Sequence, residues 1–327
     1  MRSLLLSLLL LSLTSCPLLW SASAAGSISY VDPTQWNYGT GYTYTLYSYA
    51  AYCPYETLDT WTCKWCQANE TTRSFQTSGF FNDRDTNTYG YAGYNTDLEQ
   101  IIVAFRGTEM GSLKNWITDL KYAKLTPLKS YPNVSVHDGF YQAWKNLSPQ
   151  VMPVVQALHQ QFANYDVVVT GHSLGAALAT LCMVELAENN IPAYIWDYGR
   201  PRVGNQPFSM LSMQSAKASF RHVNQRDTVP HLPLEAMGFF HAPTEVWYHE
   251  NEWRVCDPTN GEDRTCSDSQ YFDTSISDHL HYFNLYESCS SKKRTDDEAD
   301  QLDSTPPPYW PPTADQRRLY RELGLKF

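Results

Sequence analysis

The sequence predicts an α/β fold in which a mainly parallel sheet carries helices on both faces, and three observations lead to that prediction. Short runs of β-branched and other apolar residues alternate along the chain with longer segments of helical periodicity. One of the strand-like runs leads through a glycine-bounded turn directly into a helix. No linker rich in Gly, Ser or Pro interrupts residues 27–290, so we expect one domain, residues 25–290. The expected strands are residues 101–106, 166–170, 193–197 and 219–223, and the expected helices are residues 140–162 and 174–187.

Residues 1–24 have the features of a signal peptide. One basic residue precedes a leucine-rich run that is too short to span a bilayer, and a small-x-small cleavage pattern ends at Ala24. An alternative is a bacterial lipoprotein box, which would place a lipid on Cys16. We expect secretion to the extracellular space, because Asn-x-Ser/Thr sequons fit a glycosylating secretory pathway. These sequons begin at Asn69, Asn133 and Asn146.

The cysteines indicate disulfides. All of the 8 cysteines except Cys16 follow the leader, so an odd number remains. Cys182 lies among leucines in the helical segment after the turn, where a small buried thiol packs well, and the others are available for disulfides in an oxidising compartment. Cys63 and Cys66 could instead form a redox or metal-binding Cys-x-x-Cys pair, but neither a second such pair nor a His-x-x-x-His accompanies them.

The glycine-bounded turn lies in the segment TGHSLGAALA and has Ser173 at the centre of Gly-x-Ser-x-Gly. A serine on such a strand-to-helix turn is held with backbone strain, and side chains at Gly171 or Gly175 would collide with the neighbouring strand or helix. The hydroxyl then stands just before a helix N-terminus, which favours negative charge. A chance pentapeptide in an ordinary turn is the alternative, but the strand before and the helix after favour a nucleophile elbow.

A serine hydroxyl is a poor nucleophile until a positioned base removes its proton, and the base needs an acid to fix its tautomer. In the chain order serine, acid, histidine, Asp227 follows a strand-like run in a turn, whereas the rival Asp197 lies inside an expected strand. Near the end of the domain, SDHLHYF offers His279 and His281 as the base. On a helix these two side chains would point about 200° apart, so only one of them could face the serine.

Eight stretches, in the same order, resemble the class 3 lipase family, the secreted triacylglycerol lipases of filamentous fungi of the Rhizomucor and Thermomyces types, over residues 44–289. The resemblance implies an α/β-hydrolase fold in a single domain with a helical lid, with Ser173 as nucleophile, Asp227 as acid and His279 as base. His281 falls at the family's variable position in Asp-His-Leu-x-Tyr-Phe and is expected at the surface. The matching stretches are AYC at Ala51, AFRGT at Ala104, NWITDL at Asn115, VHDGF at Val136, TGHSLGAALA at Thr170, YGRPRVGN at Tyr198, VNQRDTVPHLP at Val223 and DHLHYF at Asp278.

Two donors are expected to hold the oxyanion, and loss of one such donor typically costs about 10² to 10³ in rate. One is the backbone N–H of Leu174, after the nucleophile, and by resemblance the second is Thr108, for which an edge turn is the alternative. His172 is expected to be structural, because a neighbour of the elbow serine points away from it. The residues that resemble those of the family's substrate pocket are Tyr52, His137 and Phe140. A packed histidine beside a helix start is an equal interpretation of His137.

The family's disulfide pairing is also implied by the resemblance. It joins Cys53 to Cys289, Cys63 to Cys66, and Cys256 to Cys266. The sequence alone cannot select this connectivity.

The segment EMGSLKNWITDLKYA, after Thr108, carries one apolar stripe with helical spacing. The stripe consists of Leu113, Trp116, Ile117 and Leu120. A core helix is the alternative, but the position of the segment resembles the family's lid. Turning four large apolar side chains toward water would cost roughly 6 to 12 kcal/mol as an upper bound, whereas an oil surface could receive them. We therefore expect this lid to cover the serine in water and to open at a lipid interface.

The sequence thus predicts a secreted lipase that cleaves carboxylic ester bonds of acylglycerols through an acyl-enzyme. Two alternatives are a feruloyl-type carbohydrate esterase, which has the same triad but a polar lid, and a catalytically inactive binding protein on a hydrolase scaffold. A net charge of −10 with no basic patch argues against nucleic-acid binding. We expect no metal or organic cofactor, and a monomer that acts peripherally at the lipid–water interface. Residues 291–327 are charged and then proline-rich, which predicts a disordered tail.

Overall fold

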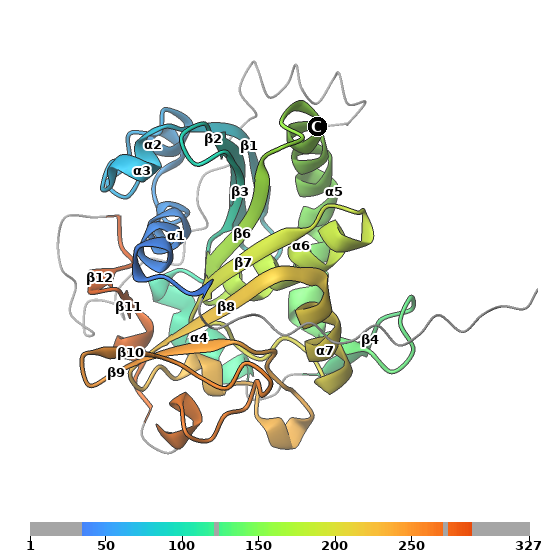
Figure 1. Ribbon diagram of the computed structural model, residues 1–327. Coiled ribbons are helices and arrows are strands. Elements are labelled where there is room, and N and C mark those ends of the chain that lie inside the picture. The colour runs from blue at the N-terminus through green and yellow to red at the C-terminus, as the bar shows by residue number, and fades with distance from the viewer. Residues whose placement is uncertain (1–34, 121–123, 271–273, 290–327) are drawn as a thin grey trace, which may run out of the picture.

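The computed structural model describes residues 35–120, 124–270 and 274–289. The expected signal peptide and the expected C-terminal tail lie outside these residues. An eight-stranded sheet forms the centre of the described chain (Figure 1). In spatial order its strands are β1 (Phe75–Asp83), β2 (Thr88–Asn95), β3 (Gln100–Phe105), β6 (Asp166–His172), β7 (Ala193–Tyr198), β8 (Ala216–Asn224), β9 (Glu245–His249) and β10 (Glu252–Val255).

The middle of the sheet is parallel and its edges are antiparallel. The pairings β3–β6, β6–β7, β7–β8 and β8–β9 are parallel, while β1–β2, β2–β3 and β9–β10 are antiparallel. The prediction of a mainly parallel sheet is confirmed. Three of the four expected strands lie within observed ones, and the fourth, residues 101–106, runs one residue past the end of β3. The antiparallel edge strands were not predicted.

Helices cover both faces of the sheet (Figure 1). Helix α1 (Tyr38–Ala50) packs on β6 and β7, while α5 (Asp138–Gln161), α6 (Leu174–Glu188) and α7 (Gln206–Ser215) lie on the opposite face. The shorter elements are α2 (Tyr55–Asp59), α3 (Glu70–Arg73), α4 (Met110–Leu120), α8 (Ile276–His279), the hairpin β4 (Leu125–Pro127) and β5 (Ser135–His137), the hairpin β11 (His281–Tyr282) and β12 (Leu285–Tyr286), and 3-10 turns at Val229–His231, Glu235–Met237 and Ser267–Gln270.

Alternate residues of the central strands serve two separate cores, because successive side chains of a strand point to opposite faces. Ile101 and Val103 pack with the apolar faces of α5 and α6. Ile102, Ala104 and Val168 pack with the aromatic side chains of α1. Burial on both faces explains why these strands are continuous apolar runs in the sequence.

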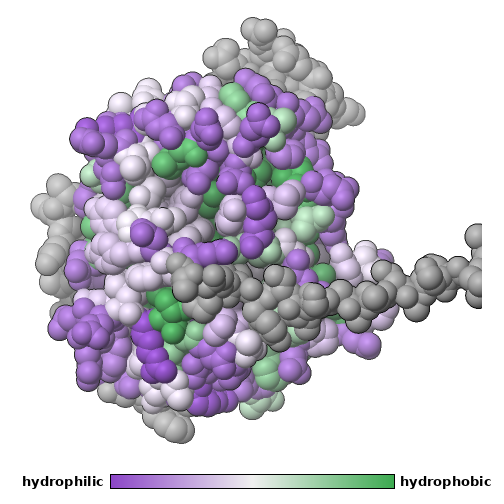
Figure 2. Space-filling view, in the orientation of Figure 1, coloured by the Kyte–Doolittle hydropathy of each residue, from purple (hydrophilic) through white to green (hydrophobic). Residues whose placement is uncertain are grey.

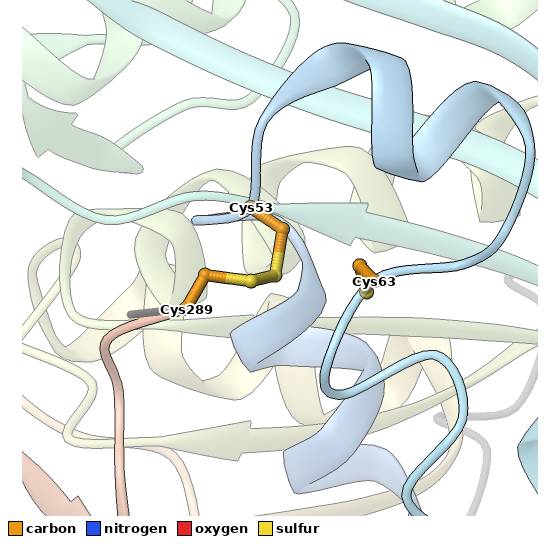
Figure 3. A group of neighbouring side chains, drawn as sticks. All are labelled: Cys53, Cys63 and Cys289. Carbon is orange, nitrogen blue, oxygen red and sulfur yellow. A yellow bond between two sulfur atoms is a disulfide. The ribbon is translucent and has the colours of Figure 1, made fainter. Parts of the chain in front are cut away.

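Three disulfides join the cysteines in the pattern that the resemblance implies. Cys53, just after α1, is bonded to Cys289 at the other end of the described chain, a separation of 236 residues (Figure 3). Cys63 lies beside that bond in Figure 3, but its sulfur pairs with Cys66. Cys256 pairs with Cys266, and Cys182 is a free buried thiol in α6. The Cys-x-x-Cys pair is therefore a disulfide in this structure.

The surface is polar over most of the face drawn in Figure 2, where hydrophobic residues occur in small separate groups. Among the described residues, Tyr38 is the one large hydrophobic residue that is about half exposed. In the same part of the chain, no helix combines the length and apolar character needed to cross a membrane.

The three sequons lie at different places on this surface. Asn69 caps the N-terminus of α3, Asn133 occupies the turn between β4 and β5 with a φ of 68°, and Asn146 is exposed on α5. Whether they carry glycans stays a prediction.

Candidate active site

Ser173 lies on the tight turn between β6 and α6, with φ 59° and ψ −127°. This is a conformation that non-glycine residues rarely adopt. A Cβ on Gly171 would approach the backbone carbonyl carbon of Gly175 to 2.4 Å, and a Cβ on Gly175 would approach the carbonyl oxygen of Phe105 to 2.2 Å. Both contacts are impossible, so the strained turn and its two glycines are as the sequence predicts.

Asp227 and His279 form a fully buried pair. Asp227 follows β8 in a turn, His279 is the last residue of α8, and the imidazole Nδ1 lies 2.9 Å from both carboxylate oxygens. The carboxylate also accepts the Val229 N–H at 2.8 Å and the Tyr282 hydroxyl at 2.6 Å. Because Nδ1–H faces a carboxylate, Nε2 of His279 is the free, basic nitrogen.

The rival residues have other partners. Asp197 is buried in β7, where its carboxylate lies 2.9 Å from the Arg200 guanidinium, and burial raises the pKa of this carboxyl to about 6. Helix α8 ends at His279, so His281 is not on the same helix but begins β11. Its ring is half-buried, with Nδ1 at 2.8 Å from the Ser277 carbonyl, rather than fully at the surface as expected.

The segment Tyr198–Gly199 adjoins both the serine and the histidine. The Ser173 N–H donates to the Tyr198 carbonyl at 2.9 Å, and a Cβ on the next residue, Gly199, would lie 2.8 Å from the His279 ring. Ser173 Oγ and His279 Nε2 are both buried, and neither has a hydrogen-bond partner among the described residues. In enzymes without substrate, the hydrogen bond between the nucleophile and the base is often long or poorly aligned.

One expected oxyanion donor, Leu174, follows the serine directly, and the other, Thr108, comes after β3. Leu174 begins α6, where backbone N–H groups point toward the helix N-terminus. Thr108 follows β3, and its hydroxyl is buried without a hydrogen-bond partner in the described residues. The end of β3 is fixed by Arg106, whose guanidinium lies 2.6 Å from Glu109 and 2.8 Å from the Asn87 side chain.

Tyr52 and His172 are hydrogen-bonded to each other beside the candidate site. The Tyr52 hydroxyl accepts the Gly107 N–H at 3.1 Å and lies 2.7 Å from His172 Nδ1, so it contacts the segment just before Thr108. His172 is fully buried and structural as expected, but its ring stacks on His279, with centroids 4.5 Å apart. Sequence reasoning missed Tyr282, although it stands three residues after His279 in the segment that supplies the base.

Helix α4 borders a cavity of about 390 Å³ that reaches Leu174. Leu113, Ile117 and Leu120 of the predicted stripe are buried and Trp116 is half-buried against the core, while the opposite face of the helix is exposed. The cavity is lined by Thr86, Trp116, Asp119, Leu120, Lys124, His137, Asp138, Gly139, Phe140, Ala143 and Leu174. The amphipathic helix therefore forms part of the wall of a pocket beside the elbow.

His137 and Phe140 both line this cavity. Their rings stack at 3.9 Å, and His137 Nδ1 accepts the Phe140 N–H at 3.3 Å. Burial lowers the pKa of His137 to about 4, so the ring is neutral near pH 7 and its proton is on Nε2. Nε2 has no hydrogen-bond partner in the described residues. His137 is thus both a packed histidine at a helix start and a pocket residue.

Three groups of side chains in the described chain have donor atoms close enough to surround a metal ion. Two of them contain disulfide-bonded cysteines, which are not thiolate ligands. In the third, Arg202 lies 2.7 Å from Glu262 and 3.3 Å from Asp268, and Arg264 lies 2.5 Å from Glu235. Guanidinium groups therefore neutralise those carboxylates.

The chain resembles proteins of known activity. A sequence model of the family described as lipase (class 3) matches residues 102–237. A lipase from Rhizomucor miehei is 35% identical over 257 residues, which is 74% of this chain and 67% of that protein. A secreted mono- and diacylglycerol lipase from Fusarium solani is 32% identical over 176 residues, 51% of this chain and 52% of that protein. A solved structure titled as a triacylglycerol lipase whose catalytic centre is a serine protease triad has a TM-score of 0.71 and 31% identity, with coverage of 77% of this chain and 96% of that one.

Proposed function

The chain belongs to the class 3 lipase family, and from this we propose that it is a secreted lipase that hydrolyses the carboxylic ester bonds of acylglycerols. The observation that carries the proposal is the strained Ser173 turn beside the buried Asp227–His279 pair. These groups constitute a serine-hydrolase triad. The names of the relatives supply the substrate class, since they include triacylglycerol and mono- and diacylglycerol lipases.

In the proposed mechanism, Ser173 Oγ attacks the ester carbonyl carbon while His279 Nε2 takes its proton. The backbone N–H groups of Leu174 and Thr108 hold the negative charge that develops on the carbonyl oxygen. Asp227 fixes the tautomer of His279 and stabilises the imidazolium. The alcohol leaves with the proton from His279, and a water activated by the same nitrogen releases the fatty acid.

Helix α4 is the proposed lid. Trp116 and Leu120 of its stripe line the cavity that reaches Leu174, while Leu113 and Ile117 pack on the core. In this position the helix restricts the approach of an ester to Ser173 from that side. Exposing the stripe to water is costly, whereas a lipid surface would receive it. The enzyme thus acts peripherally at the lipid–water interface. We also propose that it is an extracellular monomer. In its pocket, Tyr52 supports the oxyanion side, and His137 and Phe140 border the acyl chain.

The test compares two substrates, a triglyceride emulsion and methyl ferulate, with the wild type and Ser173→Ala. Hydrolysis of the emulsion that is lost in Ser173→Ala and retained in the control Ser74→Ala, far from the site, supports the proposal. Preference for methyl ferulate would replace it with a carbohydrate esterase. If neither substrate is hydrolysed in a way that depends on Ser173, the protein is instead a catalytically inactive binding protein.

A further inference from the structure

A continuous line of hydrogen bonds runs behind the candidate active site, from the segment that carries Thr108 to the segment that carries the base. The Gly107 N–H lies 3.1 Å from the Tyr52 hydroxyl, which lies 2.7 Å from His172 Nδ1. The other ring nitrogen, His172 Nε2, lies 2.8 Å from the backbone carbonyl oxygen of His279. The line joins four segments that are far apart along the sequence.

The partners determine where the protons are. The His279 carbonyl can only accept, so His172 Nε2 carries a proton, and in the neutral ring Nδ1 is then an acceptor. The Tyr52 O–H therefore donates to Nδ1, and its oxygen accepts from the Gly107 N–H. Every member donates toward His279, an arrangement in which successive bonds polarise and strengthen one another.

His172 is suited to remain neutral. Burial, and then the neighbouring His279 ring, hold the pKa of His172 well below its usual range. During turnover His279 becomes positively charged, and a second charged ring stacked on it would oppose that step. The neutral His172 ring can therefore hold the His279 ring in place without competing with it for a proton.

The surroundings leave His172 little freedom. Its ring is stacked on His279 with an interplanar angle of 29°, and Tyr49 and Tyr282 meet it edge-on at 5.6 Å and 5.7 Å. Tyr52 is itself anchored, because its neighbour Cys53 is bonded to Cys289. A displacement of His172 would thus be passed to the base on one side and to Gly107 on the other.

We propose that His172 is a positioning residue that holds the base His279 and the oxyanion segment Gly107–Thr108 in register through Tyr52. This inference rests on the proposed esterase function of the same site. Its consequence is that the chemical step, and not substrate binding, depends on His172.

The test uses the full chain and a soluble short-chain ester, so that lid opening at an interface does not limit the rate. His172→Phe keeps an aromatic ring but removes both hydrogen bonds, and we expect kcat to fall by about 10- to 100-fold with KM changed by less than about three-fold, because small misplacements of catalytic groups are costly. Tyr52→Phe should lower kcat less. The double variant should be no worse than His172→Phe, since the two residues act in one line.

Two amide variants separate positioning from simple packing. The side-chain nitrogen of His172→Gln can take the place of Nε2 and donate to the His279 carbonyl, whereas His172→Asn offers polar atoms only near the position of Nδ1. We expect Gln to restore most of kcat and Asn to restore little. His222→Phe is the control, because His222 is an equally buried histidine that stacks on Tyr198 and faces the Asp197 carbonyl but does not touch His279. It should lower Tm but leave kcat within about two-fold of the wild type.

The inference is overturned if folded His172→Phe keeps the wild-type kcat, if kcat falls equally in His222→Phe, or if the losses in the double variant add. Should His172→Phe not fold, the comparison of Tyr52→Phe with the wild type tests the inference. A lower kcat in Tyr52→Phe supports it, and an unchanged kcat overturns it. Nitrogen NMR of the wild type should show His172 neutral with its proton on Nε2 from pH 5 to 9, and a charged ring or a proton on Nδ1 refutes the line of donors. If wild-type ester hydrolysis does not depend on Ser173, the proposed function fails instead.

Discussion

At the residue scale, the buried carboxylate of Asp227 explains much of the site. It accepts hydrogen bonds from the Val229 N–H, His279 Nδ1 and the Tyr282 hydroxyl. A buried charge is tolerated only when such donors compensate its lost hydration. The donors also direct the carboxylate toward the imidazole, so stability and catalysis depend on the same contacts.

Tyr282→Phe should therefore destabilise the protein more than an ordinary buried tyrosine change. Loss of a hydrogen bond to a charged group costs about 1.5 to 3 kcal/mol, against about 0.5 to 1.5 kcal/mol for one between neutral groups. Tyr198→Phe is the matched control, because its buried hydroxyl donates to the neutral Gly41 carbonyl. Urea unfolding at pH 7 measures both, and equal losses would show that the Tyr282 hydroxyl does not compensate a charge.

The sequence predicts Ser173 well because the demands on it are local. The strained turn and the collisions at Gly171 and Gly175 arise from neighbouring residues, so a short pattern contains them. The contact between Tyr52 and His172 joins residues 120 positions apart, and no spacing rule reveals it. The sequence thus predicts the reacting groups better than the groups that position them.

At the element scale, α4 is an amphipathic helix that packs on the core and also borders the pocket beside the elbow. Its stripe was predicted from periodicity, and Leu113, Ile117 and Leu120 are buried as expected. The edge strands β1, β2, β9 and β10 were not predicted, because their mixed polar and aromatic residues lack the continuous apolar runs of the central strands. Helix α8 is also too short to give a periodic signal.

A charge on the buried face of α4 should have opposite effects on soluble and emulsified substrates. Ile117→Asp removes about 1.5 to 3 kcal/mol of burial from the closed position, so activity on a soluble ester should rise by about ten-fold or more. Activity on a triglyceride emulsion should fall, because the stripe meets the lipid less well. Thr118→Asp places the same charge on the exposed face and should change neither by much. A parallel fall on both substrates with Ile117→Asp would contradict the lid assignment.

At the scale of the whole molecule, the fold buries several histidines in neutral form. Burial lowers the pKa of His222 to about 3, and holds those of His172 and His241 well below their usual range. His222 Nε2 also accepts the Trp36 indole N–H at 3.0 Å, which leaves no lone pair for a proton. Burial has the opposite effect on the carboxyl group of Asp197, because it raises the pKa of this group to about 6.

The buried histidines should make the protein sensitive to acid. A histidine with a lowered folded pKa binds fewer protons when folded, so its stability contribution is complete above the unfolded pKa and is lost as pH falls toward the folded value. For His222 this window runs from pH 6.5 to about 3. His222→Phe should reduce the slope of unfolding free energy against pH by about 1.4 kcal/mol per pH unit between about pH 4 and 6. An unchanged slope in His222→Phe would contradict this account.

The most direct test of the central claim is covalent labelling of the nucleophile. A nitrophenyl alkylphosphonate, presented in micelles, phosphonylates an activated serine and leaves the modified residue to be located by peptide mass spectrometry. The account predicts one adduct on Ser173, absent in Ser173→Ala and formed far more slowly in His279→Ala. An adduct on a different serine, or undiminished labelling of Ser173 in folded His279→Ala, would contradict it.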